Sequence, residues 1–329
     1  MVPTLSASAT ERVMAMSDVL DAWADEYWPD AVTGLQLGGE DLEQVLARHA
    51  GFERHRHGSR ARLARSIRGV RHLGFPDTVG LRSPRLVFSA DGYSTYPRDL
   101  ESVRWSDFTD AHPLRDFSRR PGQKNKPIAF YSTTVRDLVN CESRLERSFV
   151  LVADYDPRVV HIGAQTFAIQ FPPGDELRRH TVDFVVLALG RVPVAVDVKT
   201  PSEAARPEAI ARHERVRTIL NRAGIGHVVW TGRDRTVIEN LAFLASSKVP
   251  LAVANTVRAR AVQHSRGGVA AGQLATVIAP WIGDWPASSG RTAHPRSLAL
   301  VVIRSLIWDR HLTTDLTTPF TQMSRVFAA

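Results

Sequence analysis

The chain has 329 residues, of which 43% are apolar and 23% are charged, and its formal net charge is +8. This length exceeds the usual size of one hydrophobic core, so two or three domains are expected. No apolar run is long enough for a membrane span, no secretory signal is recognisable, and the single Cys141 excludes a disulfide framework and a cysteine-based zinc site. We therefore expect a cytoplasmic protein with no membrane partner.

The N-terminal part of the chain predicts helices of opposite charge. Residues 10–31 and 40–50 have helical patterns with many acidic side chains. Residues 54–72 then carry seven arginines and three histidines without an acidic residue, and 59–73 has the apolar stripe of a basic helix. Such a block is either a solvated face or a surface that binds a polyanion. Because its basic residues are mainly arginines, which suit phosphate recognition, binding of nucleic acid is favoured. The predicted DNA-binding residues here are Arg54, Arg56, Arg60, Arg62, Arg65, Arg68 and Arg71.

The segments that follow have mixed patterns. Short strands are expected at 85–89 and 102–105. A second basic segment at 113–132 has the composition of a loop. It adds four predicted DNA-binding residues, Arg119, Arg120, Lys124 and Lys126. A helix is predicted at 134–150, and the hydroxyl side chains of 132–134 would cap it.

The next part of the sequence predicts a mixed α/β core. The expected elements, in order, are strands at 158–163, 165–171, 180–188 and 192–199, a helix at 203–223, a strand at 227–230 and a helix at 234–246. A helix followed by several strands, a helix, a strand and a helix is typical of a mixed sheet covered by helices.

The C-terminal part predicts three helices followed by a β-hairpin. The helices are expected at 253–264, 272–282 and 295–308. Polar and apolar residues then alternate through 313–326, which indicates an edge hairpin or a wing. We expect three domains: an N-terminal helical and β region at 1–111, a catalytic domain at 112–249, and a winged-helix-like domain at 250–329.

An aspartate and an Asp-Val-Lys triplet on neighbouring predicted strands indicate the chemistry. Asp183 lies in strand 180–188, and Asp197 and Lys199 lie in strand 192–199. Because side chains alternate along a strand, Asp197 and Lys199 share one face. Two carboxylates can hold Mg²⁺ at a scissile phosphate while the lysine orients the attacking water. The alternative is two surface carboxylates and a solvated lysine.

A third carboxylate can come from the preceding helix, where Glu142 and Glu146 are four residues apart on one face. The residues alone do not choose between them, and either could instead pair with a nearby arginine. His180 could contact substrate or orient a ligand, although a structural hydrogen bond would explain it equally well. Gln165 begins a predicted strand and faces either the site or an edge. No G-x-x-x-x-G-K-[S/T] loop is present, so ATP hydrolysis is not expected.

An ordered set of motifs lies at 121–125, 142–149, 154–159, 165–167, 179–184 and 196–199. In order and spacing this set resembles the TnsA family, the endonuclease subunits of heteromeric transposases, over about 113–250. The resemblance implies a restriction-endonuclease-like PD-(D/E)XK core. It favours Glu146 as the helix carboxylate, with Asp183 and Asp197 as the other ligands of Mg²⁺, for which Mn²⁺ can substitute. Lys199 then positions water.

The resemblance also implies a setting. The expected partners are double-stranded DNA at transposon ends, a transposase subunit that cuts the other strand, and an AAA+ regulatory ATPase that contacts a winged-helix domain. The sequence departs from the family pattern at Val182 and Thr166, where proline is usual, and neither change removes a ligand. Two alternatives remain: a stand-alone nickase in defence or repair, and a DNA-binding adaptor with a relic nuclease core.

Overall fold

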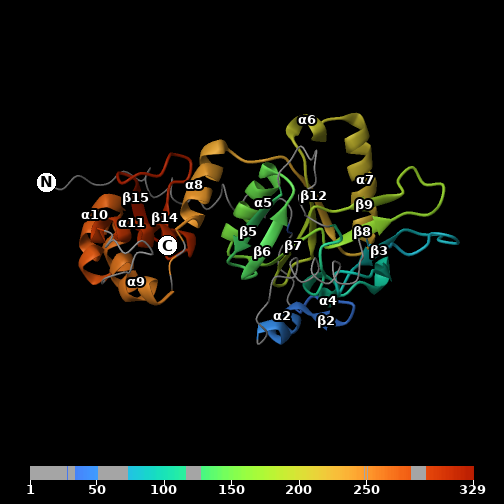
Figure 1. Cartoon of the computed structure of the whole chain (residues 1–329), viewed down its shortest axis with the longest axis horizontal. Coiled ribbons are helices and arrows are strands. Elements are labelled where there is room, and N and C mark those ends of the chain that lie inside the picture. Colours follow the sequence, from blue (N-terminus) through green and yellow to red (C-terminus); the bar gives the residue numbers. More distant parts are fainter. Residues whose placement is uncertain are drawn as a thin grey trace. The chain divides into compact units, whose positions relative to one another are not determined.

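The computed structural model describes residues 28, 34–50, 73–115, 127–247, 249, 251–282 and 294–329. These residues form a mixed α/β protein with several sheets, as expected (Figure 1). The helices predicted at 10–31 and 59–73 lie almost wholly outside the described residues. All the arginines and lysines predicted to bind DNA also lie outside them.

The described chain belongs to two compact units, one spanning Trp23–Gly232 and the other containing Arg233–Ala329. The boundary predicted between 111 and 112 falls inside the first unit, and the boundary predicted between 249 and 250 falls inside the second. No helix in the described part of the chain combines the length and the apolar character needed to cross a bilayer.

The first unit is built on a four-stranded sheet with the order β12-β11-β10-β7. Its strands are β7 (Val159–Ala164), β10 (Phe184–Ala188), β11 (Val194–Val198) and β12 (Gly226–Trp230). β10 pairs antiparallel with β7 and β11, whereas β11 and β12 are parallel. Parallel neighbours need a crossover connection, which contains α6 (Pro201–Ala204) and α7 (Pro207–Arg222). These strands confirm the central part of the predicted order.

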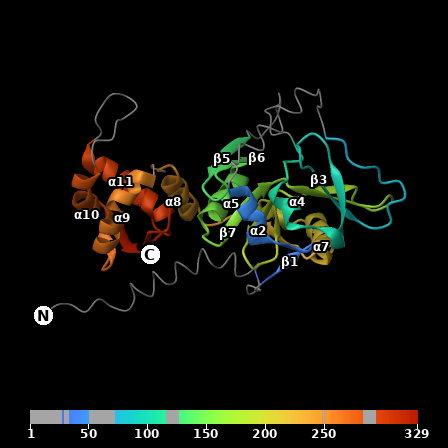
Figure 2. The same cartoon turned by 90° about the horizontal axis from the view of Figure 1, so that it is seen from below.

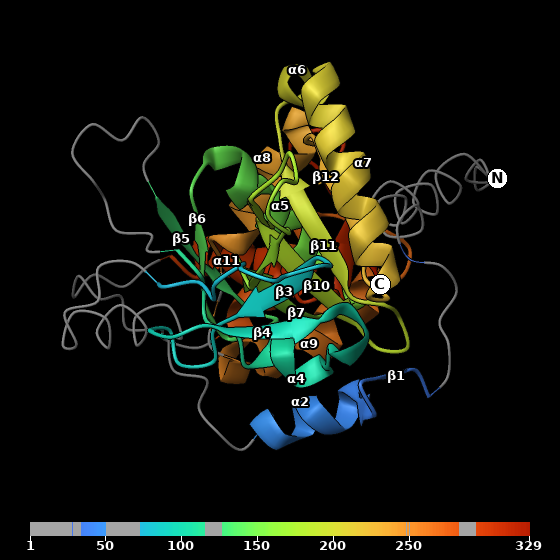
Figure 3. The same cartoon turned by 90° about the vertical axis from the view of Figure 1, so that its right-hand side faces the viewer.

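Both faces of this sheet are covered by helices, which explains the unbroken apolar sequences of β10 and β11. On one face, Phe149 of α5 (Arg144–Tyr155) packs against Phe184 and Trp230 with ring centroids 5.3 Å and 5.7 Å apart. On the other, residues of α7 such as Val216 share a core with Ala195. Figure 3 shows α5 and α7 on the two sides of β10 and β11.

A second, antiparallel sheet continues from the first, with the order β4-β3-β8-β9. Its strands are β3 (Arg85–Phe88), β4 (Tyr96–Asp99), β8 (Phe167–Gln170) and β9 (Arg179–Thr181). The single strand predicted at 180–188 is therefore two strands in different sheets. Asp183 lies at the junction, where its N–H donates to the Val196 carbonyl at 3.1 Å and its carbonyl accepts from the Gln165 N–H at 2.9 Å.

The strand predicted at 102–105 is wrong. This segment contains the short helix η1 (Leu100–Ser102) and the start of α4 (Trp105–Thr109). The Asp107 carboxylate accepts the Arg104 N–H at 2.9 Å and so begins the helix, while Trp105 and Phe108 enter the core. Helix capping and burial of two aromatic rings outweigh the β-propensity of Val103 and Trp105.

The N-terminal end of the helix predicted at 134–150 is also wrong. Residues 128–141 form an antiparallel hairpin of β5 (Ile128–Ser132) and β6 (Asp137–Cys141). Burial along β6 alternates with period two rather than with helical spacing. The hydroxyl residues at 132–134 do not cap a helix but bind Asp154, which fixes the hairpin turn on α5. Ser143 is the cap of α5, and its hydroxyl accepts the Glu146 N–H.

The helix predicted at 40–50 is confirmed as α2 (Leu42–Ala50), which follows a short hairpin of β1 (Gln36–Leu37) and β2 (Glu40–Asp41). α2 lies beside α4 (Figure 2). The Glu40 carboxylate accepts the Ser106 N–H at 2.8 Å and the Ser106 hydroxyl at 3.0 Å. These contacts place 34–50 in the same unit as the central sheet.

The second unit contains α8 (Arg235–Ala245), α9 (Leu251–Ser265), α10 (Ala271–Ile278), η2 (Ala279–Trp281) and α11 (Pro295–Trp308). Its three-stranded sheet has the order β13-β15-β14, formed by β13 (Val269–Ala270), β14 (Leu312–Thr314) and β15 (Arg325–Ala328). The predicted helices and the predicted hairpin after them are present. Asn240 of α8 holds the hairpin loop, because its amide donates to the carbonyls of Leu316 and Thr318.

Candidate metal and catalytic site

Asp183 and Lys199 form the centre of the predicted site. The Lys199 ammonium donates to Asp183 Oδ2 at 2.9 Å, and the Val198 N–H donates to the same oxygen at 2.8 Å. The Asp183 side chain is 17% exposed and that of Lys199 is 33% exposed, so both remain accessible to a ligand. Burial raises the pKa of Asp183, although the Lys199 charge opposes the rise. Burial alone would lower the pKa of Lys199, but Asp183, Asp197 and Glu146 together outweigh it and the pKa is raised.

Glu146 reaches this pair from the first turn of α5. Its carboxylate accepts the Glu142 N–H at 2.6 Å and the Ser143 hydroxyl at 3.0 Å, so it also caps its own helix. Burial raises the pKa of Glu146 to about 7; the hydrogen bond from Glu142 opposes the rise, and the charge of Asp183 adds to it. Glu146, Asp183 and Lys199 therefore form one electrostatic group, and the charge of Asp197 also raises the pKa values of Asp183 and Lys199.

Glu142 points toward Gln165. Gln165 Nε2 donates to Glu142 Oε1 at 3.0 Å, and Arg115 Nη1 lies 3.6 Å from the other carboxylate oxygen. Gln165 has a positive φ of 47° at the point where the chain passes from β7 to β8, and it is 2% exposed. Glu142 precedes Ser143, the cap of α5, so the prediction that Glu142 and Glu146 share one helical face is wrong. Glu146 lies near Asp183, and Glu142 lies with Gln165.

Asp197 has a different environment from Asp183, because imidazoles surround it. His180 Nε2 and His227 Nε2 each lie 2.8 Å from Asp197 Oδ2, and His213 Nδ1 lies 3.3 Å from the same oxygen. Asp197 is 1% exposed. Burial alone would raise its pKa, but the contacts with the three histidines outweigh burial and hold the pKa well below its usual range.

His180, Asp197 and His227 have ligand atoms within 4.8 Å of one another, the one such group of three or more His, Cys, Asp or Glu side chains found among the described residues. His180 was predicted as a supporting residue, and the structure places it against Asp197. The roles of Asp183, Asp197 and Glu146 as metal ligands and of Lys199 in catalysis stay predictions.

Sequence reasoning missed His213 and His227. A signal existed for each. His213 continues the buried stripe of α7 that includes Val216 and Leu220, and His227 occupies a buried position in an otherwise apolar strand. A histidine at a core position needs a polar partner, and Asp197 is the partner in both cases.

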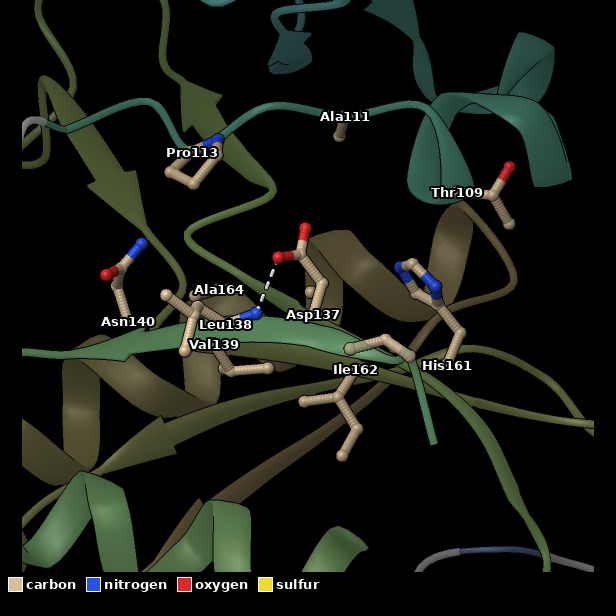
Figure 4. Close-up of a pocket in the computed structure, with 12 residues that line it drawn as sticks. Thr109, Ala111, Pro113, Asp137, Leu138, Val139, Asn140, His161, Ile162 and Ala164 are labelled. Atoms are coloured by element: carbon tan, nitrogen blue, oxygen red, sulfur yellow. Dashed lines mark hydrogen bonds between the residues drawn. The ribbon is translucent and has the colours of Figure 1, made fainter. Parts of the chain in front are cut away.

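A pocket elsewhere in the first unit lies between the hairpin, β7 and the segment 109–113. Asp137 and His161 point from β6 and β7 toward that segment (Figure 4). The lining residues are Thr109, Ala111, Pro113, Val135, Asp137, Leu138, Val139, Asn140, His161, Ile162, Gly163 and Ala164. None of the predicted catalytic or supporting residues is among them, so this pocket is not the predicted active site.

Comparison of this sequence with protein-family models and with curated proteins gives no match.

Proposed function

We propose that this protein is a metal-dependent DNA endonuclease with a restriction-endonuclease-like core. The observation that carries the proposal is the convergence of Glu146, Asp183 and Lys199 from α5, the start of β10 and the end of β11. The order α5, β7, β10, β11, α7, β12, with one parallel strand pair after the crossover, supports a PD-(D/E)XK core.

The donor set fits a hard divalent cation. Glu146 and Asp183 offer carboxylate oxygens, which are the ligands that Mg²⁺ and Mn²⁺ prefer. Burial raises the pKa of both carboxyl groups, and the charge of Asp183 adds to the rise at Glu146 as the charge of Asp197 does at Asp183. A nearby cation would favour their ionised forms. When bound there, Mg²⁺ would act as a Lewis acid toward a phosphate oxygen.

Lys199 supplies the positive charge that phosphodiester hydrolysis needs besides the metal. Its ammonium is held by Asp183 Oδ2 and by the Val198 carbonyl at 3.0 Å. From this position it can orient an attacking water and offset negative charge that develops on the phosphate. Glu146 and Asp183 would hold the cation, and the partly exposed ammonium of Lys199 would be available to the phosphate.

The DNA substrate and the partners follow from the same proposal. We propose nicking of one strand at transposon ends, with a transposase subunit cutting the other strand and an AAA+ ATPase regulating both. The helices and the three-stranded sheet of the second unit support a winged-helix domain there. The basic blocks at 54–72 and 113–132 support a DNA contact through phosphate charge. A stand-alone nickase would use the same site without these partners.

One observation favours a second candidate, the non-catalytic DNA-binding adaptor. Asp197, a predicted Mg²⁺ ligand, is 1% exposed and is enclosed by histidines. If Glu146 and Asp183 cannot hold a catalytic cation without Asp197, the core is a relic. Calorimetric titration of the wild type and of Asp183→Asn with Mn²⁺ separates the candidates, because the adaptor would give the same binding curve for both.

The direct test is nicking of supercoiled DNA that carries transposon ends, in Mg²⁺ and in a chelator. We expect cleavage only with the metal, and a loss of at least about 100-fold for Asp183→Asn. The matched control is Glu208→Gln, which removes an exposed carboxylate at the start of α7 in the same unit. Equal cleavage by wild type and Asp183→Asn would reject the proposal.

A further inference from the structure

Three imidazoles from separate elements converge on one carboxylate oxygen in the first unit. His180 lies on β9, His213 on α7, His227 on β12 and Asp197 on β11. Their side chains are 10%, 6%, 0% and 1% exposed, respectively. A buried cluster of this composition brings together ligand types that bind transition metals and needs a physical explanation.

Hydrogen bonding within the cluster does not satisfy all its buried polar atoms. Asp197 Oδ1, His213 Nδ1 and His227 Nδ1 are buried and have no hydrogen-bond partner among the described residues. His213 Nδ1 is within ion-pair distance of Asp197 Oδ2 but does not meet hydrogen-bond geometry. Buried polar atoms are nearly always paired, and leaving one unpaired costs about 1–3 kcal/mol. These unpaired atoms show that hydrogen bonding alone does not account for the cluster.

The spacing of the ligand atoms suits a small divalent transition metal. Zinc binds nitrogen at about 2.0–2.1 Å and carboxylate oxygen at about 2.0–2.2 Å, so neighbouring ligand atoms in a tetrahedral site are about 3.4 Å apart. Here the separations from Asp197 Oδ2 are 2.8 Å, 2.8 Å and 3.3 Å. Outward movement of two imidazoles by about half an ångström opens the site to an ion.

We propose that His180, Asp197 and His227 bind one divalent transition metal of the Zn²⁺ class, with His213 packed beside them. Imidazole nitrogen disfavours Mg²⁺, which prefers oxygen, so this centre is distinct in chemistry from the Glu146–Asp183 group. The cluster side chains are at most 10% exposed, which closes the site to substrate as in a structural site. The ion would tie β9, β11 and β12 together, and so fix the strand that Lys199 follows.

The test is metal binding by the full-length protein without DNA, so its outcome is independent of nuclease activity. After removal of metal by a chelator, Zn²⁺ is titrated against a chromogenic chelator, and Co²⁺ is added to a second sample as a spectroscopic probe. We expect one Zn²⁺ per chain, no competition by millimolar Mg²⁺, and visible Co²⁺ bands of tetrahedral intensity. These measurements on the wild type need no variant to fold.

Two variants assign the site. His180→Gln changes the most exposed of the three ligands, and we expect a loss of Zn²⁺ affinity of at least about 100-fold. His264→Gln changes an exposed histidine in the second unit and serves as the matched control, with unchanged binding. The proposal is overturned if the wild type binds no Zn²⁺ tighter than about 10 μM, if His180→Gln binds as the wild type does, or if Mg²⁺ displaces Zn²⁺. Any of these results would leave a metal-free hydrogen-bonded cluster.

Discussion

Replacing Glu146 by glutamine tests the electrostatics of the proposed site, because glutamine resembles the protonated carboxyl group without its titration. The pKa of Glu146 is raised from 4.5 to about 7, first by burial and then by the charge of Asp183. The folded protein therefore holds this proton more tightly than the unfolded chain does. The stabilisation from that proton is fully present below pH 4.5 and is lost as pH rises to about 7.

The magnitude follows from the size of the pKa change. One pKa unit corresponds to about 1.4 kcal/mol, so the rise from 4.5 to about 7 corresponds to roughly 3 kcal/mol of the free energy of unfolding. Glu146→Gln should have nearly wild-type stability at pH 4. At pH 8 it should be more stable than the wild type by up to about 3 kcal/mol.

The assay is urea unfolding at half-unit pH intervals from 4 to 8, with fluorescence and circular dichroism recorded together to separate the two units. The control for the loss of one carboxylate is Glu239→Gln. The Glu239 side chain lies on α8 and is 62% exposed. A stability difference between Glu146→Gln and the wild type that does not change with pH would refute the reasoning. Saturating Mg²⁺ should stabilise the wild type above pH 7 and have little effect on Glu146→Gln.

Three further predictions follow from the same structure. Cleavage at limiting Mg²⁺ should rise between pH 6 and 8, because the metal must displace the proton of Glu146; a pH-independent rate at saturating DNA would contradict this. Asp154→Ala should lower the free energy of unfolding by about 2–4 kcal/mol in urea titrations, because Asp154 accepts hydrogen bonds from the turn 133–134. A decrease of less than about 0.5 kcal/mol would show that these hydrogen bonds do not hold the hairpin. Changing Arg62 and Arg65 to alanine should reduce the salt dependence of DNA binding by about 1–2 in the log–log slope, measured by fluorescence anisotropy, and an unchanged slope would remove this block from the interface.

The central strands could be predicted from the sequence because their signal is local. β10 and β11 are short apolar runs that both faces of the sheet bury, and Pro201 marks the end of the second run. The chemistry-bearing residues Asp183 and Lys199 were identified because they stand at the ends of these runs. The contact between them follows from antiparallel pairing of the two strands.

The hairpin at 128–141 could not be predicted in the same way. Leu138 and Cys141 have a spacing to Leu145 and Phe149 that imitates a helical stripe, although Leu138 is 37% exposed. The hairpin depends on a tertiary contact, because Asp154 of the following helix holds its turn. Such a contact has no local sequence signal, and it overrides helix propensity.

The histidine cluster was missed for a related reason. His213 and His227 reach Asp197 only because the crossover through α7 returns the chain to a strand parallel to β11. The sequence shows two isolated histidines, and neither has a carboxylate at ligand spacing beside it. The fold also gives Asp197 and Asp183 different surroundings. The pairing of their two strands alone does not indicate this difference.

The most direct measurement of the central claim is strand-resolved cleavage of a labelled duplex that contains a transposon end, by wild type, Lys199→Ala and Arg235→Ala. Arg235 is 88% exposed and lies outside the site, so its variant controls for the loss of one positive charge. The account predicts a Mg²⁺-dependent nick in one strand by the wild type and by Arg235→Ala, and a rate at least about 100-fold lower for Lys199→Ala at equal DNA binding. Cleavage by Lys199→Ala at the wild-type rate would contradict the account.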